Sequence, residues 1–221
     1  MSYNIAIDGP AGAGKSTIAK AVAKKMGLIY VDTGAMYRAM ALHMLKRGIN
    51  IEDDEAVIAE CVHPDITIKY EDGVQVVYLN GENVNAFLRT EEVGNAASKT
   101  SVLMPVRIRL VELQQKLAAE SDCIMDGRDI GTCVLPNADV KIYLTASSAV
   151  RAKRRYDELT AKGQECDIVE IKRIIEERDC RDMNREASPL KQAEDAVLVD
   201  TSDMTIEEVI AKIISICENK R

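Results

Sequence analysis

The chain has 221 residues, of which 47% are hydrophobic and 29% charged, and its formal net charge is −7 at pH 7. This composition excludes an unstructured tail protein, a collagen and a coiled-coil rod. The acidic balance also disfavours binding to nucleic acid or to an acidic membrane surface, because both need a basic surface. We expect a globular protein without nucleic-acid or membrane partners. Its six scattered cysteines fit free thiols in a reducing cytoplasm.

The N-terminal part of the chain predicts strands that alternate with helices. An apolar segment at 3–7 is followed by a glycine-rich stretch and an alanine-rich helical pattern that runs to about Lys25. A second short apolar segment, at 28–31, leads into a helix that runs to about Lys46. This alternation indicates a mainly parallel sheet with helices on both faces.

Between residues 65 and 88 the pattern changes to that of an antiparallel hairpin. The segments ITIKY and VQVVYLNGE alternate in polarity, and Asp72-Gly73 between them is a strong turn signal. Because a hairpin interrupts the strand–helix alternation here, we expect a small inserted β subdomain.

The rest of the chain returns to the alternating pattern. Helical patterns occupy 90–101, 105–120, 147–162, 168–185 and 206–218, and strand patterns occupy 123–125, 140–144 and 196–199. No internal repeat or linker interrupts them. The predicted fold class is therefore α/β, a single domain around a mainly parallel five-stranded sheet flanked by helices.

The strongest motif is GPAGAGKS at 9–16, which fits the phosphate-binding pattern G-x-x-x-x-G-K-[ST] between a predicted strand and a predicted helix. Glycines let successive backbone N–H groups converge on phosphate oxygens, and the helix adds the positive end of its dipole. Lys15 would reach the β- and γ-phosphates, and the Ser16 hydroxyl would bind Mg²⁺. The dinucleotide pattern G-x-G-x-x-G fails, because Gly14 is followed by Lys-Ser-Thr. The chain is predicted to bind a nucleoside triphosphate.

Arginine clusters bear on what happens to the γ-phosphate. A switch or motor needs a group that positions water, whereas a kinase needs an acceptor pocket and a way to exclude water. Arg178, Asp182 and Arg185 are spaced i, i+4, i+7 and share one helix face, and Arg151 and Arg155 repeat the i, i+4 spacing on the preceding helix. Each cluster alone could be a solvated face. Two of them beside a phosphate-binding loop favour phosphate clamps, and thus a kinase.

Five stretches, in their order and spacing, resemble bacterial-type cytidylate kinases, within the nucleoside monophosphate kinase branch of P-loop proteins. They are IDGPAGAGKST at 7–17, DTGAMYR at 32–38, NAAS at 95–98, DGRDIGT at 126–132 and ERDCRDMNREASPL at 177–190. The resemblance covers essentially the whole chain, and the hairpin fits a small antiparallel β insertion typical of the family. It implies a P-loop kinase fold with a core at 1–34, 102–146 and 186–221, a monophosphate-binding part at 35–101 and a short helical lid region at 147–185.

The resemblance implies that ATP is the phosphate donor. Arg154 and Arg155 look like lid residues that close over the transferring phosphoryl group. The residues that would wrap the ATP phosphates are Gly9, Pro10, Ala11, Gly12, Ala13, Gly14, Lys15, Ser16 and Thr17. The implied catalytic set is Lys15, Arg128, Arg154, Arg155 and Arg185.

The resemblance also implies an acceptor site in which arginines bind the phosphate and other polar side chains bind the pentose and the base. Its residues would be Arg38, Arg128 and Arg185 at the α-phosphate, Arg178 and Asp182 at the pentose, Ser98, Arg107 and Asp129 at the base, and Tyr37 lining the pocket.

A phosphate acceptor with a second pKa of about 6 is already a nucleophile near pH 7, so no general base is needed. Accordingly, neither His43 nor His63 is expected to be catalytic. Asp126 ends a predicted strand, and two roles stay open for it: a metal site that holds Mg²⁺ through water, or a carboxylate that orders the loop. Asp8, just before the phosphate-binding motif, is expected to be structural.

We therefore expect a monomeric cytoplasmic enzyme that transfers the γ-phosphate of ATP to CMP or dCMP, giving CDP or dCDP. One alternative is a kinase of the same architecture that acts on UMP or another nucleoside monophosphate. Another is a P-loop NTPase switch that uses its arginine-rich helices as a partner surface. A switch would hydrolyse ATP alone, whereas a kinase depends on its acceptor.

Overall fold

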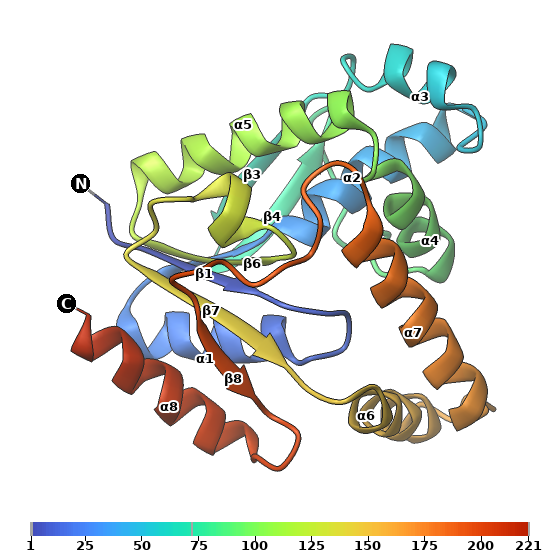
Figure 1. Ribbon diagram of the computed structural model, residues 1–221. Helices are drawn as coiled ribbons and strands as arrows, with labels where there is room; N and C mark the ends of the chain where they lie inside the picture. The colour runs from blue at the N-terminus through green and yellow to red at the C-terminus, as the bar shows by residue number, and fades with distance from the viewer. Residues whose placement is uncertain (1, 72, 221) are drawn as a thin grey trace. The chain divides into compact units, whose positions relative to one another are not determined.

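The structure is a computed structural model, and it describes residues 2–71 and 73–220 (Figure 1). These residues form two compact units. The first unit contains the chain up to Tyr30 and again from Asp122 onward, and the second contains Val31–Ser121. The partition into a core, a monophosphate-binding part and a lid stays a prediction.

A five-stranded sheet with the strand order β2-β6-β1-β7-β8 forms the base of the first unit, and only the last two residues of β2 belong to the second unit. The central strand β1 pairs in parallel with β6 and β7, and β7 pairs in parallel with β8. The predicted mainly parallel sheet is thus confirmed. The strands are β1 (Asn4–Asp8), β2 (Ile29–Asp32), β6 (Cys123–Gly127), β7 (Val140–Thr145) and β8 (Val197–Asp200).

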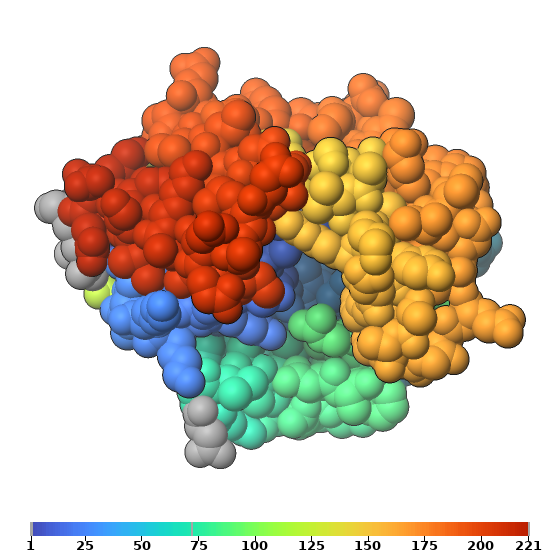
Figure 2. Space-filling view, turned by 90° about the horizontal axis from the view of Figure 1, so that it is seen from below, coloured from blue at the N-terminus to red at the C-terminus, as the bar shows by residue number. Residues whose placement is uncertain are grey.

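Helices pack on this sheet, and aliphatic side chains fill the core between them. Ile5 and Ile7 of β1 and Leu144 of β7 are fully buried together with residues of α1 and α8. Figure 2 shows these two helices next to each other at the surface. The helices of this unit are α1 (Lys15–Met26), α6 (Ser148–Ala161), α7 (Ile168–Asn184) and α8 (Ile206–Asn219), and a short π-helical turn, η1 (Ile130–Val134), follows β6.

The second unit combines four helices with a three-stranded antiparallel sheet of order β3-β4-β5. The predicted hairpin corresponds to β3 and β4, which pair from Ile66 opposite Leu79 to Glu71 opposite Val74. Of the predicted turn, Gly73 has a φ of +75°, and Asp72 lies outside the described residues. The elements are α2 (Thr33–Lys46), α3 (Asp54–Glu60), β3 (Ile66–Glu71), β4 (Val74–Leu79), β5 (Glu82–Asn83), α4 (Glu91–Thr100) and α5 (Met104–Glu120).

Two elements of the second unit, α3 and β5, were not expected from the sequence. Strand β5 returns along β4 through the two-residue turn Asn80-Gly81. Both residues have positive φ, 51° and 82°, which is the backbone that a two-residue hairpin turn requires. An Asn-Gly pair is therefore a turn signal here, although the strand after it has only two residues. Among residues 2–71 and 73–220, no helix combines the length and the apolarity of a membrane span.

Candidate active site

The predicted phosphate-binding loop lies between β1 and α1. Gly9, Gly12 and Gly14 all have positive φ, at 148°, 75° and 88°. A Cβ at Gly9 would lie 1.9 Å from the carbonyl oxygen of Leu144, so only glycine fits there. Gly14 caps α1 without a side-chain hydrogen bond, and the first N–H groups of that helix can therefore face an anion.

Lys15 is the first residue of α1 and is only 5% exposed. Its Nζ donates a hydrogen bond to the carbonyl of Pro10, 2.8 Å away in the same loop. Burial lowers the pKa of Lys15 well below its ordinary value, and the charge of Arg128 acts in the same direction, while Asp126 and Asp8 oppose both. The ammonium group of Lys15 is therefore enclosed by the loop that is predicted to bind phosphate.

Ser16 and Asp126 lie side by side. The Ser16 hydroxyl donates to Asp126 Oδ2 at 2.9 Å, and the Tyr30 hydroxyl donates to Asp126 Oδ1 at 2.7 Å. Two adjacent hard oxygen donors fit Mg²⁺, which is commonly bound by one or two protein oxygens together with phosphates and water. Within the described part of the chain, no three His, Cys, Asp or Glu side chains gather into a group that could hold a metal.

Asp8, at the end of β1, is buried and fixes the π-helical turn η1. Its two carboxylate oxygens accept hydrogen bonds from the backbone N–H groups of Ile130 and Gly131, each at 2.7 Å. Burial raises the pKa of Asp8 to about 6, although these two N–H groups lower it. The carboxylate therefore has the structural role expected from the sequence. The turn that it holds begins directly after Asp129.

The first unit brings five of the predicted acceptor-site residues together. Arg128 Nε donates to Asp182 Oδ2 at 2.8 Å, and Arg185 Nη2 lies 3.4 Å from Asp129 Oδ1. Burial alone would raise the pKa of Asp182, but the charges of Arg128, Arg178 and Arg185 hold it below its ordinary value. Three arginines thus share a small region with two carboxylates, and the cluster keeps a positive excess that suits a phosphate.

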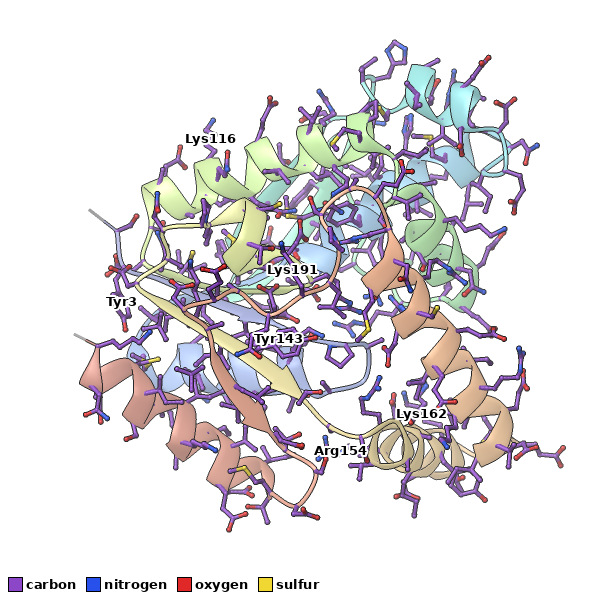
Figure 3. All side chains as sticks on the ribbon, viewed as in Figure 1. Tyr3, Lys116, Tyr143, Arg154, Lys162 and Lys191 are labelled. Carbon is purple, nitrogen blue, oxygen red and sulfur yellow. The ribbon has the colours of Figure 1, made fainter. Side chains whose placement is uncertain are left out.

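The two predicted lid residues lie on α6 and contact partners in the first unit. Arg154 reaches from α6 to the end of β8, where its guanidinium donates to the hydroxyl of Thr201 at 3.2 Å and to its carbonyl at 2.7 Å (Figure 3). Arg155 is exposed and pairs with Glu158 on the same helix, at 2.8 Å. A role for either residue in phosphoryl transfer stays a prediction.

The remaining predicted residues belong to the second unit. Tyr37 and Arg38 lie on α2, Ser98 lies on α4, and Arg107 lies on α5. Arg107 is 2% exposed, donates to the Ser101 carbonyl at 3.2 Å, and has its guanidinium carbon 5.7 Å from the centre of the Tyr37 ring. Helices α2 and α4 pack through small alanines, against which Tyr37 also packs. The second unit therefore brings Tyr37 and Arg107 together and supplies Ser98 from a neighbouring helix.

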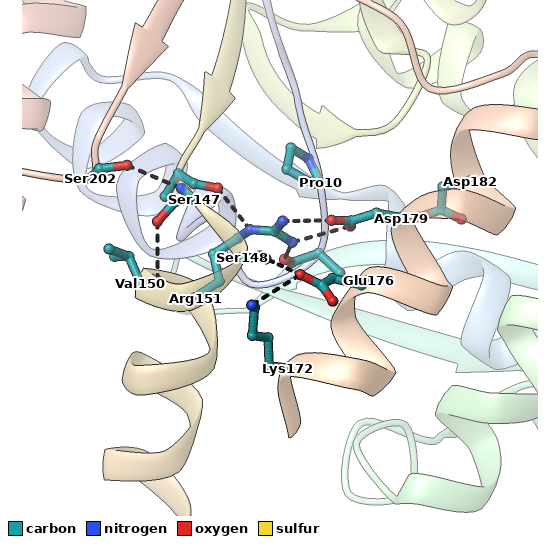
Figure 4. A network of polar contacts seen from close by, with 12 residues as sticks. Pro10, Ser147, Ser148, Val150, Arg151, Lys172, Glu176, Asp179, Asp182 and Ser202 are labelled. Carbon is teal, nitrogen blue, oxygen red and sulfur yellow. Dashed lines mark hydrogen bonds and ion pairs between the residues drawn. The ribbon is translucent and has the colours of Figure 1, made fainter. Parts of the chain in front are cut away.

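The structure corrects the interpretation of Arg151. The sequence suggested either a solvated face or a phosphate clamp, whereas Arg151 is buried and pairs with Asp179 of α7 (Figure 4). Sequence reasoning missed Asp179 altogether. A signal was present, because Asp179 follows Ile175 by four positions and precedes Asp182 by three, and all three are buried on one face of α7.

Comparison with known proteins decides the family. Residues 5–219 match the family described as cytidylate kinase. Among curated relatives, the cytidylate kinase of Listeria welshimeri is 52% identical over 98% of this chain and 96% of that protein. Those of Caldicellulosiruptor bescii and Lactobacillus johnsonii are 50% and 49% identical, over 96% and 98% of this chain and 94% of each protein.

This chain belongs to the cytidylate kinase family. The resemblance found in the sequence is confirmed. The family match favours neither the P-loop NTPase switch nor the kinase that acts on UMP or another nucleoside monophosphate.

Solved structures agree on the fold. A gluconokinase from Sinorhizobium meliloti has a TM-score of 0.51 at 12% identity, covering 98% of this chain and 92% of its own. A shikimate kinase from Acinetobacter baumannii has a TM-score of 0.50 at 15% identity, covering 100% and 96%. The P-loop kinase fold predicted for this cytidylate kinase family member is thus confirmed.

Proposed function

We propose that this chain transfers the γ-phosphate of ATP to CMP or dCMP, forming ADP and CDP or dCDP. The observation that carries the proposal is the match to cytidylate kinases at about half identity over nearly the whole chain. The arrangement of the first unit supports it, because a glycine loop with a buried lysine and a separate arginine cluster suit a donor and an acceptor phosphate.

On the donor side, the backbone of residues 9–17 binds the ATP phosphates, and Lys15 neutralises the β- and γ-oxygens. Ser16 and Asp126 would hold Mg²⁺, which when bound supplies further positive charge next to those oxygens. Their 2.9 Å contact supports this assignment, because it places two oxygen ligands side by side at the end of the loop. Tyr30 would keep the Asp126 carboxylate oriented.

On the acceptor side, we assign the phosphate of CMP to three arginines, one of which, Arg38, lies on α2 and the others in the first unit. The pentose is assigned to Arg178 and Asp182, the base to Ser98, Arg107 and Asp129, and the pocket wall to Tyr37. The full set is Tyr37, Arg38, Ser98, Arg107, Arg128, Asp129, Arg178, Asp182 and Arg185. Arginine suits such a site because its planar fork binds phosphate and carboxylate oxygens in pairs.

The chemical step needs positioning and charge rather than a base, since the acceptor phosphate is already largely a dianion near pH 7. Lys15, Arg128 and Arg185 would stabilise the charge that spreads over the transferring phosphoryl group. Arg154 and Arg155 would also contact the transferring phosphoryl group, after releasing Thr201 and Glu158, respectively. For Arg155 this exchange costs little, because a surface ion pair contributes about 1 kcal/mol or less.

A coupled assay of ADP formation tests the proposal. ATP is supplied with CMP, dCMP, UMP, AMP or GMP in turn, and once without an acceptor. We expect CMP and dCMP to give the highest rates and the acceptor-free reaction to give almost none. Comparable turnover of UMP would support the alternative kinase, and steady ADP release without an acceptor would support the NTPase switch.

We also propose that the protein is a monomer. Light scattering tests this, because a monomer should have the mass of one chain, 24.4 kDa.

A further inference from the structure

Arg151 of α6 is buried in the first unit, and its guanidinium makes contacts in three directions. Its Nε donates to the carbonyl of Ala146 at 2.9 Å, and its Nη1 donates to the carbonyl of Ala11 at 2.8 Å. Both oxygens of Asp179 accept from it, at 3.1 Å from Nη1 and 2.5 Å from Nη2 (Figure 4). One side chain therefore joins the phosphate-binding loop, the end of β7 and helix α7.

The contact with Ala11 determines the direction of one peptide group of the loop. The peptide between Ala11 and Gly12 is trans and planar, so its C=O and N–H point in opposite directions. Since Arg151 holds the Ala11 oxygen, the Gly12 N–H is directed away from Arg151. A Cβ at Gly12 would lie 3.6 Å from the Cβ of Arg151, so the stem of this side chain also lies against the loop backbone.

Asp179 explains why a buried arginine is stable at this place. An unpaired buried charge is very costly, whereas a guanidinium bound at both oxygens of a carboxylate is compensated and fixed in direction. Helices α6 and α7 also pack through Ala152, Ile171 and Ile175, and Ser148 donates to Glu176 at 2.7 Å. The pair is thus mounted on two helices that are held together independently of it.

We propose that Arg151, held by Asp179, is a positioning residue for the triphosphate. It fixes the peptide between Ala11 and Gly12 so that the Gly12 N–H faces the bound phosphates, and it does so without contacting ATP. The proposal rests on the proposed function only in taking ATP as the ligand of the loop. A phosphate clamp would keep its guanidinium available for the ligand, whereas Arg151 makes four hydrogen bonds to protein acceptors.

The decisive variant is Arg151→Lys, which keeps the charge but has three N–H donors on a single nitrogen and so cannot make the four hydrogen bonds of the planar guanidinium. We expect the Kd of a non-hydrolysable ATP analogue, measured by calorimetry without CMP, to rise about tenfold, the scale of one hydrogen bond to a charged group. The Kd of CMP, measured without the ATP analogue, should change less than twofold. The matched control is Arg173→Lys on α7, where the guanidinium is exposed and pairs with Glu170 and Glu177. It should change neither Kd.

A second variant, Asp179→Asn, keeps the shape of the acceptor and removes its charge. We expect it to weaken binding of the ATP analogue in the same direction but less strongly. The double variant should bind the analogue about as weakly as Arg151→Lys alone, because both changes act through one contact. Unchanged affinity for the analogue, or equal weakening of the analogue and CMP, would overturn the proposal.

A measurement on the unmodified protein covers the case in which the variants do not fold. The backbone amide resonance of Gly12 should move when the ATP analogue is added, and an amide that does not respond would also overturn the inference. Turnover of CMP by the same protein tests the proposed function separately. If the enzyme phosphorylates CMP but its Arg151→Lys variant binds the ATP analogue with unchanged affinity, only this inference is wrong. If the enzyme does not phosphorylate CMP but the variants weaken binding of the analogue as expected, only the proposed function is wrong.

Discussion

Arg128 and Asp182 are 54 positions apart in the chain, and Arg128 Nε donates to Asp182 Oδ2 at 2.8 Å. Their side chains are only 20% and 11% exposed, so the pair is largely shielded from water. The carboxylate of Asp182 fixes the direction of the Arg128 guanidinium. In return, the charges of Arg128 and the neighbouring arginines lower the pKa of Asp182. An arginine proposed to bind the acceptor phosphate is thereby ordered by a partner within the protein, which reduces the entropy lost on binding.

Removing the charge of Asp182 should weaken this order. We expect Asp182→Asn to raise the KM for CMP about tenfold, since a hydrogen bond to a charged group contributes about 1.5–3 kcal/mol. The matched control is Asp157→Asn, which removes an exposed carboxylate that pairs with Lys153 on α6. Steady-state kinetics at saturating ATP checks both. A KM within twofold of the unmodified enzyme would show that Asp182 does not order the acceptor site.

Lys15 should matter far more for turnover than for folding. Its burial disfavours the charged form and its protein hydrogen bond is to one loop carbonyl, so Lys15→Ala should leave the melting temperature nearly unchanged. The same change should lower kcat by several orders of magnitude, because it removes the cation that we propose neutralises the transferring phosphate. Lys24→Ala, an exposed lysine of the same helix, serves as the control. Retention of more than about a tenth of kcat, roughly 1.4 kcal/mol of barrier, would contradict the assignment.

Asp129 should help the enzyme to distinguish cytosine from uracil. Cytosine presents an exocyclic amino group, for which a carboxylate is the natural acceptor, whereas uracil presents an oxygen there. Asp129→Asn should therefore lower kcat/KM for CMP and narrow the gap between CMP and UMP. Because Asp129 also lies 3.4 Å from Arg185, the variant lowers activity in general, and the ratio of the two nucleotides corrects for that. An active variant with an unchanged ratio would show that Asp129 does not bind the base.

Asp8 should make the stability of the protein depend on pH between about 4 and 7. The pKa of Asp8 is raised to about 6 in the folded state. As pH falls, Asp8 therefore takes up a proton at a higher pH in the folded protein than in the unfolded chain. Its contribution to the free energy of unfolding must then increase as pH falls, by about 1 kcal/mol between pH 7 and pH 5. Urea unfolding of the original protein and of Asp8→Asn at both pH values measures this difference. If the difference in unfolding free energy between the original protein and Asp8→Asn is the same at both pH values, or is smaller at pH 5, this prediction is wrong.

The parts of the molecule that follow local rules could be predicted from the sequence. The glycine loop, the strand–helix alternation and the β3–β4 hairpin depend on patterns within a few residues. The pair of Arg151 and Asp179 could not be found in this way, because its members are 28 positions apart and a spacing rule compares residues of one helix only. Arg151 and Arg155 do share a face of α6, but Asp179 and the Ala11 carbonyl cover Arg151, whereas Arg155 is exposed.

The two buried carboxylates of α7 have a consequence for how such an enzyme can diverge. Asp179 holds the arginine that touches the triphosphate loop, and Asp182, three positions later, holds an arginine assigned to the acceptor phosphate. A substitution that turns or tilts α7 moves both arginines at once, so affinity for the donor and for the acceptor would change in step. A descendant that adopted another nucleobase while keeping ATP would then have to vary at positions outside α7, such as Ser98 and Arg107, which we propose bind the base.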